Sequence, residues 1–204
     1  MKILKKIGWL FLSLVVLASI FASHEWYAKK PFMLRVFLDR SLIKMAFESP
    51  ETLTSLGFLE SVGITGHNAE LDNDSPQKGD ELFTTMTEVR ETLLTYQDED
   101  LDEGQRTSKE IAMYLLDFLS VAKEFRHHNY PLNQLFGVQN GYPSFMEAQH
   151  QVNSVEDAEN YLSRLEKVKV KFNQNLAGLK IREDKNIIPP RFVIDRVLAE
   201  MTDF

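Results

Sequence analysis

The feature that most constrains this chain is an apolar run near its amino terminus, Ile7–Ala22, which follows Lys2, Lys5 and Lys6. A basic stretch followed by an apolar one is typical of a secretory signal or a membrane anchor. As a helix rising 1.5 Å per residue, the run would reach about 24 Å, somewhat less than the roughly 30 Å hydrocarbon core of a bilayer. A cleaved signal peptide and an uncleaved anchor therefore both remain open.

The residues around this run indicate how it would be processed and oriented. A signal peptidase could cut after Val16-Leu17-Ala18 and, with a poorer motif, after Ile20-Phe21-Ala22. Trp26 and Tyr27 suit a membrane–water interface, and the leading lysines favour a cytoplasmic amino terminus if the helix is kept. We therefore predict a signal peptide or membrane anchor at 1–27 and a protein located in the cell membrane, the periplasm or elsewhere outside the cytoplasm.

Helical periodicity dominates residues 28–204. Apolar residues recur at steps of three and four, and no convincing alternating strand is present. Two such stripes predict a helical hairpin with its turn near residues 98–105. The stripes are Leu82, Met86, Val89, Leu93 and Tyr96, then Ile111, Leu115, Phe118, Ala122 and Phe125. The predicted fold class is all-α, with the amino-terminal helix followed by an irregular multi-helix bundle.

Start and stop signals place several helix ends. Proline at the first helical position predicts that one helix begins at Pro76 and that a short one runs from Pro143 to Gln149. Ser154, with Asp157 three residues later, predicts a capped helix start. The last predicted helix follows Pro190 and runs to Phe204, so we expect the bundle to be part of a larger domain.

Charge and cysteine content exclude several function classes. The first thirty residues carry a net charge of +4 and the whole chain −7, which leaves −11 on the remainder. A body this acidic repels phosphate backbones, so nucleic acid is not an expected partner. The chain contains no cysteine, which excludes disulfides, thiolate catalysis and cysteine zinc sites.

The helical period stops between residues 127 and 142, where aromatic, amide and imidazole side chains lie among Pro131, Gly137 and Gly141. Such a loop can either plug a helical bundle or line a cleft. His128, Tyr130, Asn133 and Gln134 follow one another closely within it. The residues alone do not decide between the two roles.

Motifs that resemble metal sites do not have the required spacing. The acidic stretch that begins at Asp98 lacks both the glycine and the final glutamate of a calcium loop. The pairs Glu124/His127 and Glu147/His150 imitate a di-iron motif, but the intervening prolines and glycines prevent two long facing helices. We therefore predict no metal ligand and no catalytic residue within this chain.

Four spaced segments resemble the amino-terminal part of the bacterial domain-of-unknown-function family numbered 885. These segments are Tyr130–Gly137, Gln149–Val152, Asp157–Leu165 and Ile188–Ile194, and the resemblance runs from about Trp26 to the end. It implies a large, mostly helical, zincin-like protein, generally exported and presumed to be a zinc metallopeptidase. The zinc-binding helix of that family lies downstream of these motifs, so the resemblance implies no zinc ligand among the present residues.

The resemblance gives the loop a role as a wall of a substrate cleft. Tyr130, Asn133 and Gln134 could hydrogen-bond a peptide backbone, and His128 is a weaker candidate. The functional hypothesis is the amino-terminal helical segment of an exported, membrane-associated metallopeptidase-like protein, without cofactor and not catalytic alone, with peptide as the substrate of the full-length protein. The alternative is a stand-alone membrane-tethered helical module that binds another protein.

Overall fold

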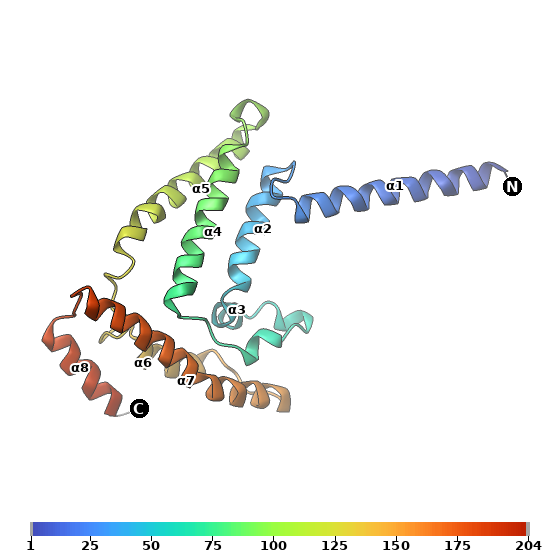
Figure 1. Cartoon of the computed structure of the whole chain (residues 1–204). Coiled ribbons are helices and arrows are strands. Elements are labelled where there is room, and N and C mark those ends of the chain that lie inside the picture. The colour runs from blue at the N-terminus through green and yellow to red at the C-terminus, as the bar shows by residue number, and fades with distance from the viewer. Residues whose placement is uncertain (1, 203–204) are drawn as a thin grey trace. The chain divides into compact units, whose positions relative to one another are not determined.

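The computed structural model describes residues 2–202, with side chains from Lys6 onward, and confirms the all-α class. The described residues form eight α-helices, joined by loops and short 3-10 turns, and contain no strand (Figure 1). The helices are α1 (Lys2–Tyr27), α2 (Leu34–Phe47), α3 (Pro50–Leu56), α4 (Pro76–Leu94), α5 (Glu103–Ala122), α6 (Val138–Ala148), α7 (Val155–Asp184) and α8 (Arg191–Thr202).

The chain divides into two compact units. Unit 1 comprises the residues up to Lys44 together with Thr87–Leu116, and unit 2 comprises Met45–Met86 with the residues from Asp117 onward. The predicted amino-terminal segment at 1–27 coincides with α1, which ends at Tyr27.

Unit 1 has a small apolar core where α2, the end of α4 and the middle of α5 meet. Leu34 and Phe37 of α2 lie against Leu93 and Tyr96, and all four are buried. The rings of Phe37 and Tyr96 are 5.9 Å apart in a tilted arrangement. The Tyr96 hydroxyl donates a hydrogen bond to the carbonyl of Pro31 at 2.7 Å, so its polar end is satisfied.

Val89, Leu93 and Tyr96 of the first predicted stripe lie in this core, but Leu82 is exposed and the prediction for α5 is wrong. Ile111 and Leu115, which we assigned to the packed face, are exposed. α5 instead turns Ala112, Met113 and Leu116 toward the core. Apolar residues occupy every position from 111 to 116, so two overlapping stripes fit the same sequence and periodicity could not choose between them.

Helix ends in unit 2 follow the local chemistry, with one correction. Ser49 caps α3 by accepting a hydrogen bond from the Thr52 amide, and Gly57 ends the helix with φ of 65°. α6 does not begin at Pro143, as predicted, but at Val138. Pro143 lies inside the helix, where its missing N–H removes one backbone hydrogen bond.

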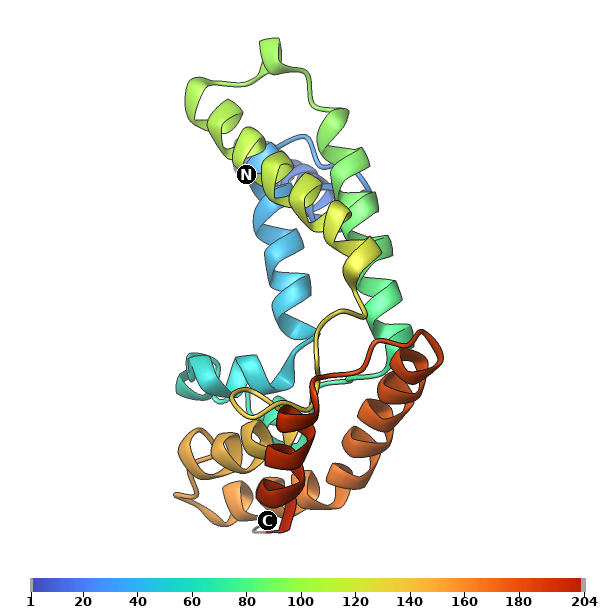
Figure 2. The same ribbon diagram turned by 90° about the vertical axis from the view of Figure 1, so that its left-hand side faces the viewer.

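Two interactions fix the carboxyl-terminal half of unit 2. α6 and α8 lie side by side (Figure 2). The Glu200 carboxylate on α8 accepts hydrogen bonds from Gln139 at 3.0 Å and from Asn140 at 2.8 Å, both on α6. The last helix, predicted after Pro190, is confirmed as α8 and is tied to α6 by a charged acceptor.

The predicted cap of α7 is present. The Asp157 amide donates to Ser154 Oγ at 3.1 Å, and the Asp157 carboxylate accepts from the Asn153 amide at 3.0 Å. The hydrogen bond from Asn153 is the main cause of the lowered pKa of Asp157, and the bond with Ser154 adds to it.

This reciprocal cap makes the stability of α7 pH-dependent. A lowered folded-state pKa gives stability that is present above the ordinary value of 3.8 and is lost as the pH falls through the folded-state value. We expect the urea midpoint to fall between about pH 6 and about pH 3, and to fall less in Asp157→Asn. Glu159→Gln, at an exposed position of the same helix, should reproduce the wild-type drop, and an unchanged drop in Asp157→Asn would count against the cap.

Candidate functional site

The buried stripe of α7 is polar rather than apolar. The buried residues on this helix are Arg164, Lys171, Asn175, Gly178 and Arg182. Their spacing of seven, four, three and four residues places them along one face. Several apolar residues of the helix, among them Leu162 and Leu176, are exposed. Buried charges require partners, so we expect the polar groups of unit 2 to gather against this face of α7.

Lys171 is the centre of one such group of partners. Its ammonium lies 2.8 Å from Glu51 Oε1 on α3 and 3.0 Å from Asp74 Oδ2, just before α4. Asn175 Nδ2 also donates to Asp74 Oδ2, at 2.8 Å. Burial alone would lower the pKa of Lys171, but Asp74 and Glu51 together more than offset it and the pKa is raised. Lys171 is therefore an ammonium held between two carboxylates.

Arg182 is paired differently, because its partners are all uncharged. Nε donates to the Asn129 carbonyl at 2.8 Å, Nη1 to the Gly178 carbonyl at 2.8 Å, and Nη2 to Asn129 Oδ1. Within the described residues no carboxylate forms an ion pair with it. Burial lowers the pKa of Arg182. A guanidinium has five N–H donors, so two of them are available to a further acceptor.

Both groups line one cavity of about 450 Å³ in unit 2. Its walls come from α7, α3, the segment before α4, the loop between α5 and α6, and the start of α6. The lining residues are Glu51, Asp74, Asn129, Pro131, Phe136, Val138, Gly141, Tyr142, Lys171, Asn175, Gly178 and Arg182. This volume is within the range of pockets that hold small ligands.

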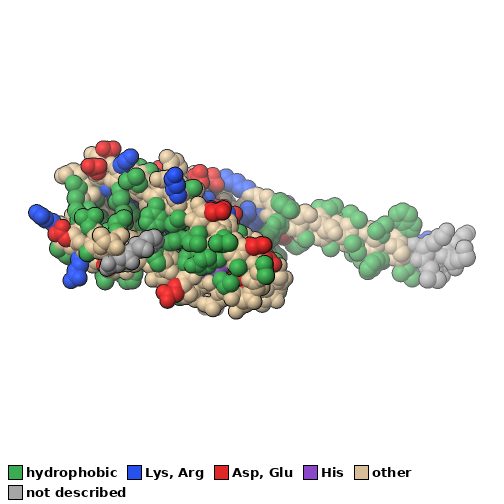
Figure 3. Space-filling model, turned by 90° about the horizontal axis from the view of Figure 1, so that it is seen from below, with side chains coloured by type: hydrophobic (Ala, Val, Ile, Leu, Met, Phe, Trp, Pro, Cys, Tyr) green, Lys and Arg blue, Asp and Glu red, His purple; other side chains and the backbone are tan. Residues whose placement is uncertain are grey.

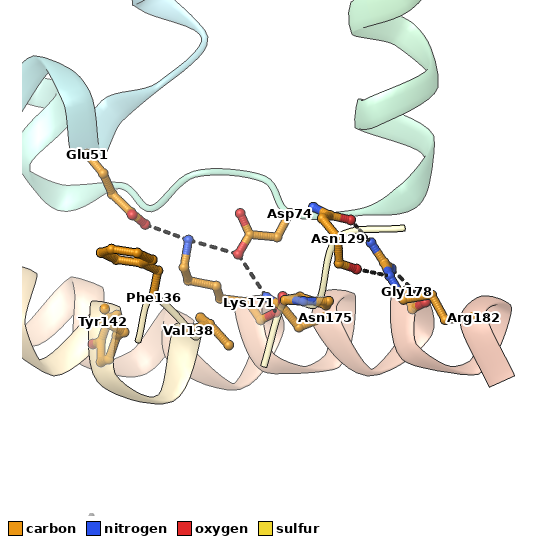
Figure 4. A pocket seen from close by; sticks show the side chains of 12 residues that line it. Glu51, Asp74, Asn129, Phe136, Val138, Tyr142, Lys171, Asn175, Gly178 and Arg182 are labelled. Atoms are coloured by element: carbon orange, nitrogen blue, oxygen red, sulfur yellow. Dashed lines mark hydrogen bonds and ion pairs between the residues drawn. The ribbon is translucent and has the colours of Figure 1, made fainter. Parts of the chain in front are cut away.

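The cavity has two chemically different ends (Figure 4). Phe136 and Tyr142 lie at one end, Arg182 and Asn129 lie at the other, and Lys171 lies between them. Phe136 is 88% exposed and Tyr142 is 5% exposed, so one aromatic ring is at the mouth and the other at the base. The two cations and two carboxylates of the lining cancel. A ligand of zero net charge with separated charges and one apolar group matches this distribution.

The comparisons with known proteins support the resemblance drawn from the motifs. The family model described as "Bacterial protein of unknown function (DUF885)" matches residues 50–204. The chain belongs to this family. A search of curated proteins and a search of solved structures gave no significant match.

The matched region contains the whole lining of the cavity, from Glu51 to Arg182. The cavity is therefore a feature of the DUF885 portion of the chain. The zincin-like character that the resemblance implies is a separate prediction, because the family description states no activity.

The four substrate-cleft residues predicted from this DUF885 resemblance lie in the same loop as three lining residues, yet none of the four lines the cavity. The loop residues that do are Asn129, Pro131 and Phe136. Tyr130 and Gln134 are half-buried, and His128 packs against Phe125 with ring centres 5.5 Å apart. The predicted contact of these four residues with a substrate stays a prediction.

The Asn133 side chain forms hydrogen bonds with the backbone of this loop. Its Nδ2 donates to the Tyr130 carbonyl at 2.9 Å, and its Oδ1 accepts from the amides of Leu135 at 3.0 Å and Phe136 at 2.8 Å. Both ends of the side-chain amide are therefore used in shaping the loop. Asn133 thus places Phe136, which is at the mouth of the cavity.

Sequence analysis missed the charged residues that line the cavity. These are Lys171, Arg182, Glu51 and Asp74. In the sequence, α7 is marked instead by apolar residues at helical spacing, namely Ala158, Tyr161, Leu165, Val168, Phe172, Leu176 and Leu179. The spacing of Arg164, Lys171, Asn175, Gly178 and Arg182 was a visible signal, since it fits a helical stripe as well as the apolar set does.

Zinc, which the DUF885 resemblance implies, does not fit the described residues. No group of three or more histidine, cysteine, aspartate or glutamate side chains that could hold a metal ion occurs among them. Two carboxylates meet at Lys171, but the ammonium occupies the position between them. We therefore derive no metal-dependent step for this chain.

Proposed function

We propose that this chain is the amino-terminal helical segment of an exported, membrane-associated metallopeptidase-like protein. In this proposal the segment binds peptide, and zinc-dependent hydrolysis requires residues other than those described. The observation that carries the proposal is Arg182, a buried guanidinium without a carboxylate partner among the described residues, on the wall of a cavity with an aromatic end.

The proposed ligand is a short peptide in its zwitterionic form. Its carboxylate would accept hydrogen bonds from the two available donors of Arg182, which is the planar recognition that guanidinium favours. Its ammonium would lie near Glu51 and Asp74, whose remaining lone pairs can accept hydrogen bonds. In a peptide long enough to reach the other end of the cavity, an apolar side chain would pack between Phe136 and Tyr142.

Calorimetry on the full chain in detergent micelles tests this proposal with the dipeptide Ala-Phe as the probe. We expect Ala-Phe to bind, and Arg182→Met to weaken it about ten- to hundredfold, because the ligand loses hydrogen bonds to a charged group. Arg191→Met removes an arginine that is 92% exposed and should leave the affinity unchanged. Thermal unfolding would establish that Arg182→Met is folded.

Two derivatives of the probe test the role of charge. Ala-Phe amide lacks the carboxylate, and N-acetyl-Ala-Phe lacks the ammonium. We expect both to bind at least tenfold more weakly than Ala-Phe. Equal binding of all three compounds, or no binding of any, would contradict the proposed function.

One observation favours the second candidate, a membrane-tethered module that binds another protein. The outer face of α5 exposes Ile111, Tyr114, Leu115, Phe118 and Val121. Contiguous exposed apolar residues on one helix commonly mark a protein contact. Failure of Ala-Phe to bind, together with self-association that Phe118→Asp abolishes in sedimentation measurements, would favour this candidate over peptide binding.

A further inference from the structure

The end of α1 is built into unit 1 through Glu25. This residue is 5% exposed although it lies in the last turn of a helix that is otherwise largely exposed. Its two carboxylate oxygens accept hydrogen bonds from the amides of Phe32 at 2.8 Å and Met33 at 3.1 Å. These are the residues immediately before α2. Glu25 therefore caps the amino terminus of α2, where negative charge is favoured.

Arg40 of α2 makes the reciprocal cap on α1. Its guanidinium, also 5% exposed, donates to the carbonyls of Glu25 at 3.1 Å, Trp26 at 2.7 Å and Lys29 at 3.4 Å. The last carbonyls of a helix lack partners within it, and a cation there is favoured by the helix dipole. Each helix thus supplies the charge that the adjacent end of the other requires.

Phe32 extends this connection one turn further back along α1. Its ring is stacked on His24 at 4.1 Å between centres and on Phe21 at 6.1 Å. The helix itself continues unbroken to Tyr27, and the Ala28 amide donates to the His24 carbonyl at 2.9 Å. The residues on both sides of the Ala22 cleavage motif are therefore helical, and two of them carry stacked rings.

The part of α1 before this connection has the character of a membrane span. Lys6–Tyr27 is a 22-residue stretch with mean hydropathy 1.9, and its most apolar part is not buried in the protein. Figure 3 shows hydrophobic side chains along its described surface. Between Lys6 and His24, residues 7–23 are uncharged and reach about 26 Å at 1.5 Å per residue, within the length range of membrane-spanning helices. The amides of Phe32 and Met33, which donate to the buried Glu25 carboxylate, also keep its charge away from lipid.

We infer that α1 is retained as a membrane anchor, rigidly joined to α2 by the Glu25–Arg40 connection, and is not a cleaved signal peptide. The partner of its apolar surface is the bilayer. Tyr27 and Phe32, 82% and 69% exposed, lie at the interface beyond the span. A peptidase needs extended, accessible backbone, whereas the bonds after Ala18 and Ala22 lie inside the continuous helix α1.

The mature amino terminus tests retention directly. The full chain would be expressed with a carboxyl-terminal tag in a Gram-negative bacterial host, extracted from membranes with detergent and weighed by intact-mass spectrometry. We expect a mass that includes the residues before Ala18, and a protein that stays in the membrane pellet after carbonate washing. A product that begins at Ser19 or Ser23 would overturn the inference.

Limited proteolysis of the same preparation tests the connection itself. We expect Arg40→Ala to increase chymotryptic cleavage after Trp26 and Tyr27 at least tenfold, because the last carbonyls of α1 lose their donors. Arg35→Ala is the matched control, since Arg35 is on the same helix and its side chain is 82% exposed. Equal cleavage of the wild type and Arg40→Ala would show that the connection does not hold α1. Neither test depends on peptide binding in unit 2.

Discussion

Arg164→Ala is expected to lower the free energy of unfolding by about 3 kcal/mol or more, because each buried acceptor that loses its donor costs about 1–3 kcal/mol. Arg164 is 0% exposed and connects α7 to three other segments. Nε donates to the Glu70 carbonyl at 2.9 Å, and Nη2 donates to Thr54 Oγ1 at 2.7 Å and to the His67 carbonyl at 3.2 Å. Alanine would leave these buried acceptors without a donor.

The fourth partner of Arg164 is His150, and the hydrogen bonds of its ring fix its tautomer. Nη1 lies 2.6 Å from His150 Nδ1, and His150 Nε2 lies 3.0 Å from the Asp157 carbonyl. A guanidinium can only donate and a carbonyl can only accept, so Nδ1 is the acceptor and Nε2 carries the hydrogen. The guanidinium also lies 4.8 Å from the centre of the Phe145 ring. Loss of Arg164 therefore disturbs α3, α6 and the cap of α7 together.

Urea unfolding of the full chain in micelles, followed by circular dichroism, measures this effect. Lys169→Ala is the control, because Lys169 is an exposed residue on the same helix, and its change should stay within about 0.5 kcal/mol. A loss of less than about 1 kcal/mol in Arg164→Ala would mean that the buried stripe of α7 does not hold unit 2 together.

Gly137→Ala is expected to lower the free energy of unfolding strongly, because alanine adds a methyl group where the loop before α6 has no room for it. A Cβ at this position would lie 2.5 Å from the Asn133 amide nitrogen and 2.6 Å from the Asn133 carbonyl oxygen, and would also collide with Gln139 Oε1. The first two are backbone atoms, which cannot turn aside. The expected cost is about 3 kcal/mol, at the upper end of the range for overpacking.

The loop would have to open to relieve this contact, which has consequences for the cavity. Asn133 accepts a hydrogen bond from Gln139 and positions Phe136 at the mouth. We therefore expect Gly137→Ala to weaken Ala-Phe binding as well as stability. Gly79→Ala, inside α4 and away from the cavity, is the control, because no atom lies within 4 Å of its added Cβ and alanine favours helix. If both variants unfolded at the same urea concentration, the loop would not be packed as described.

The extent to which the sequence predicted this fold depends on the kind of signal. Pro76, Ser154 and Pro190 act through local backbone chemistry, and the helices that they mark are confirmed. The start of α6 was misplaced because a proline one turn and a half into a helix resembles one at its start. The packed face of α5 was wrong because an unbroken apolar run contains more than one stripe.

The cavity was harder to predict because its chemistry opposes the usual pattern. Lys171 and Arg182 are long cationic residues, which are normally exposed, so nothing in the local sequence singles them out as buried. Their burial depends on Glu51, Asp74 and Asn129, which are more than fifty residues away in the chain. Local periodicity carries no information on such distant partners, and the loop chosen from the family motifs supplies only Asn129, Pro131 and Phe136 to the lining.

The most direct measurement is the nuclear magnetic resonance signal of the Arg182 Nε–H group in chain labelled with ¹⁵N at arginine. The signal can be assigned by its disappearance in Arg182→Lys, and its hydrogen bond to Asn129 protects it from exchange with water. If the cavity binds a peptide carboxylate, the signal shifts saturably on addition of Ala-Phe and stays in place with Ala-Phe amide. A signal that ignores Ala-Phe, or that follows the amide equally, would contradict the account.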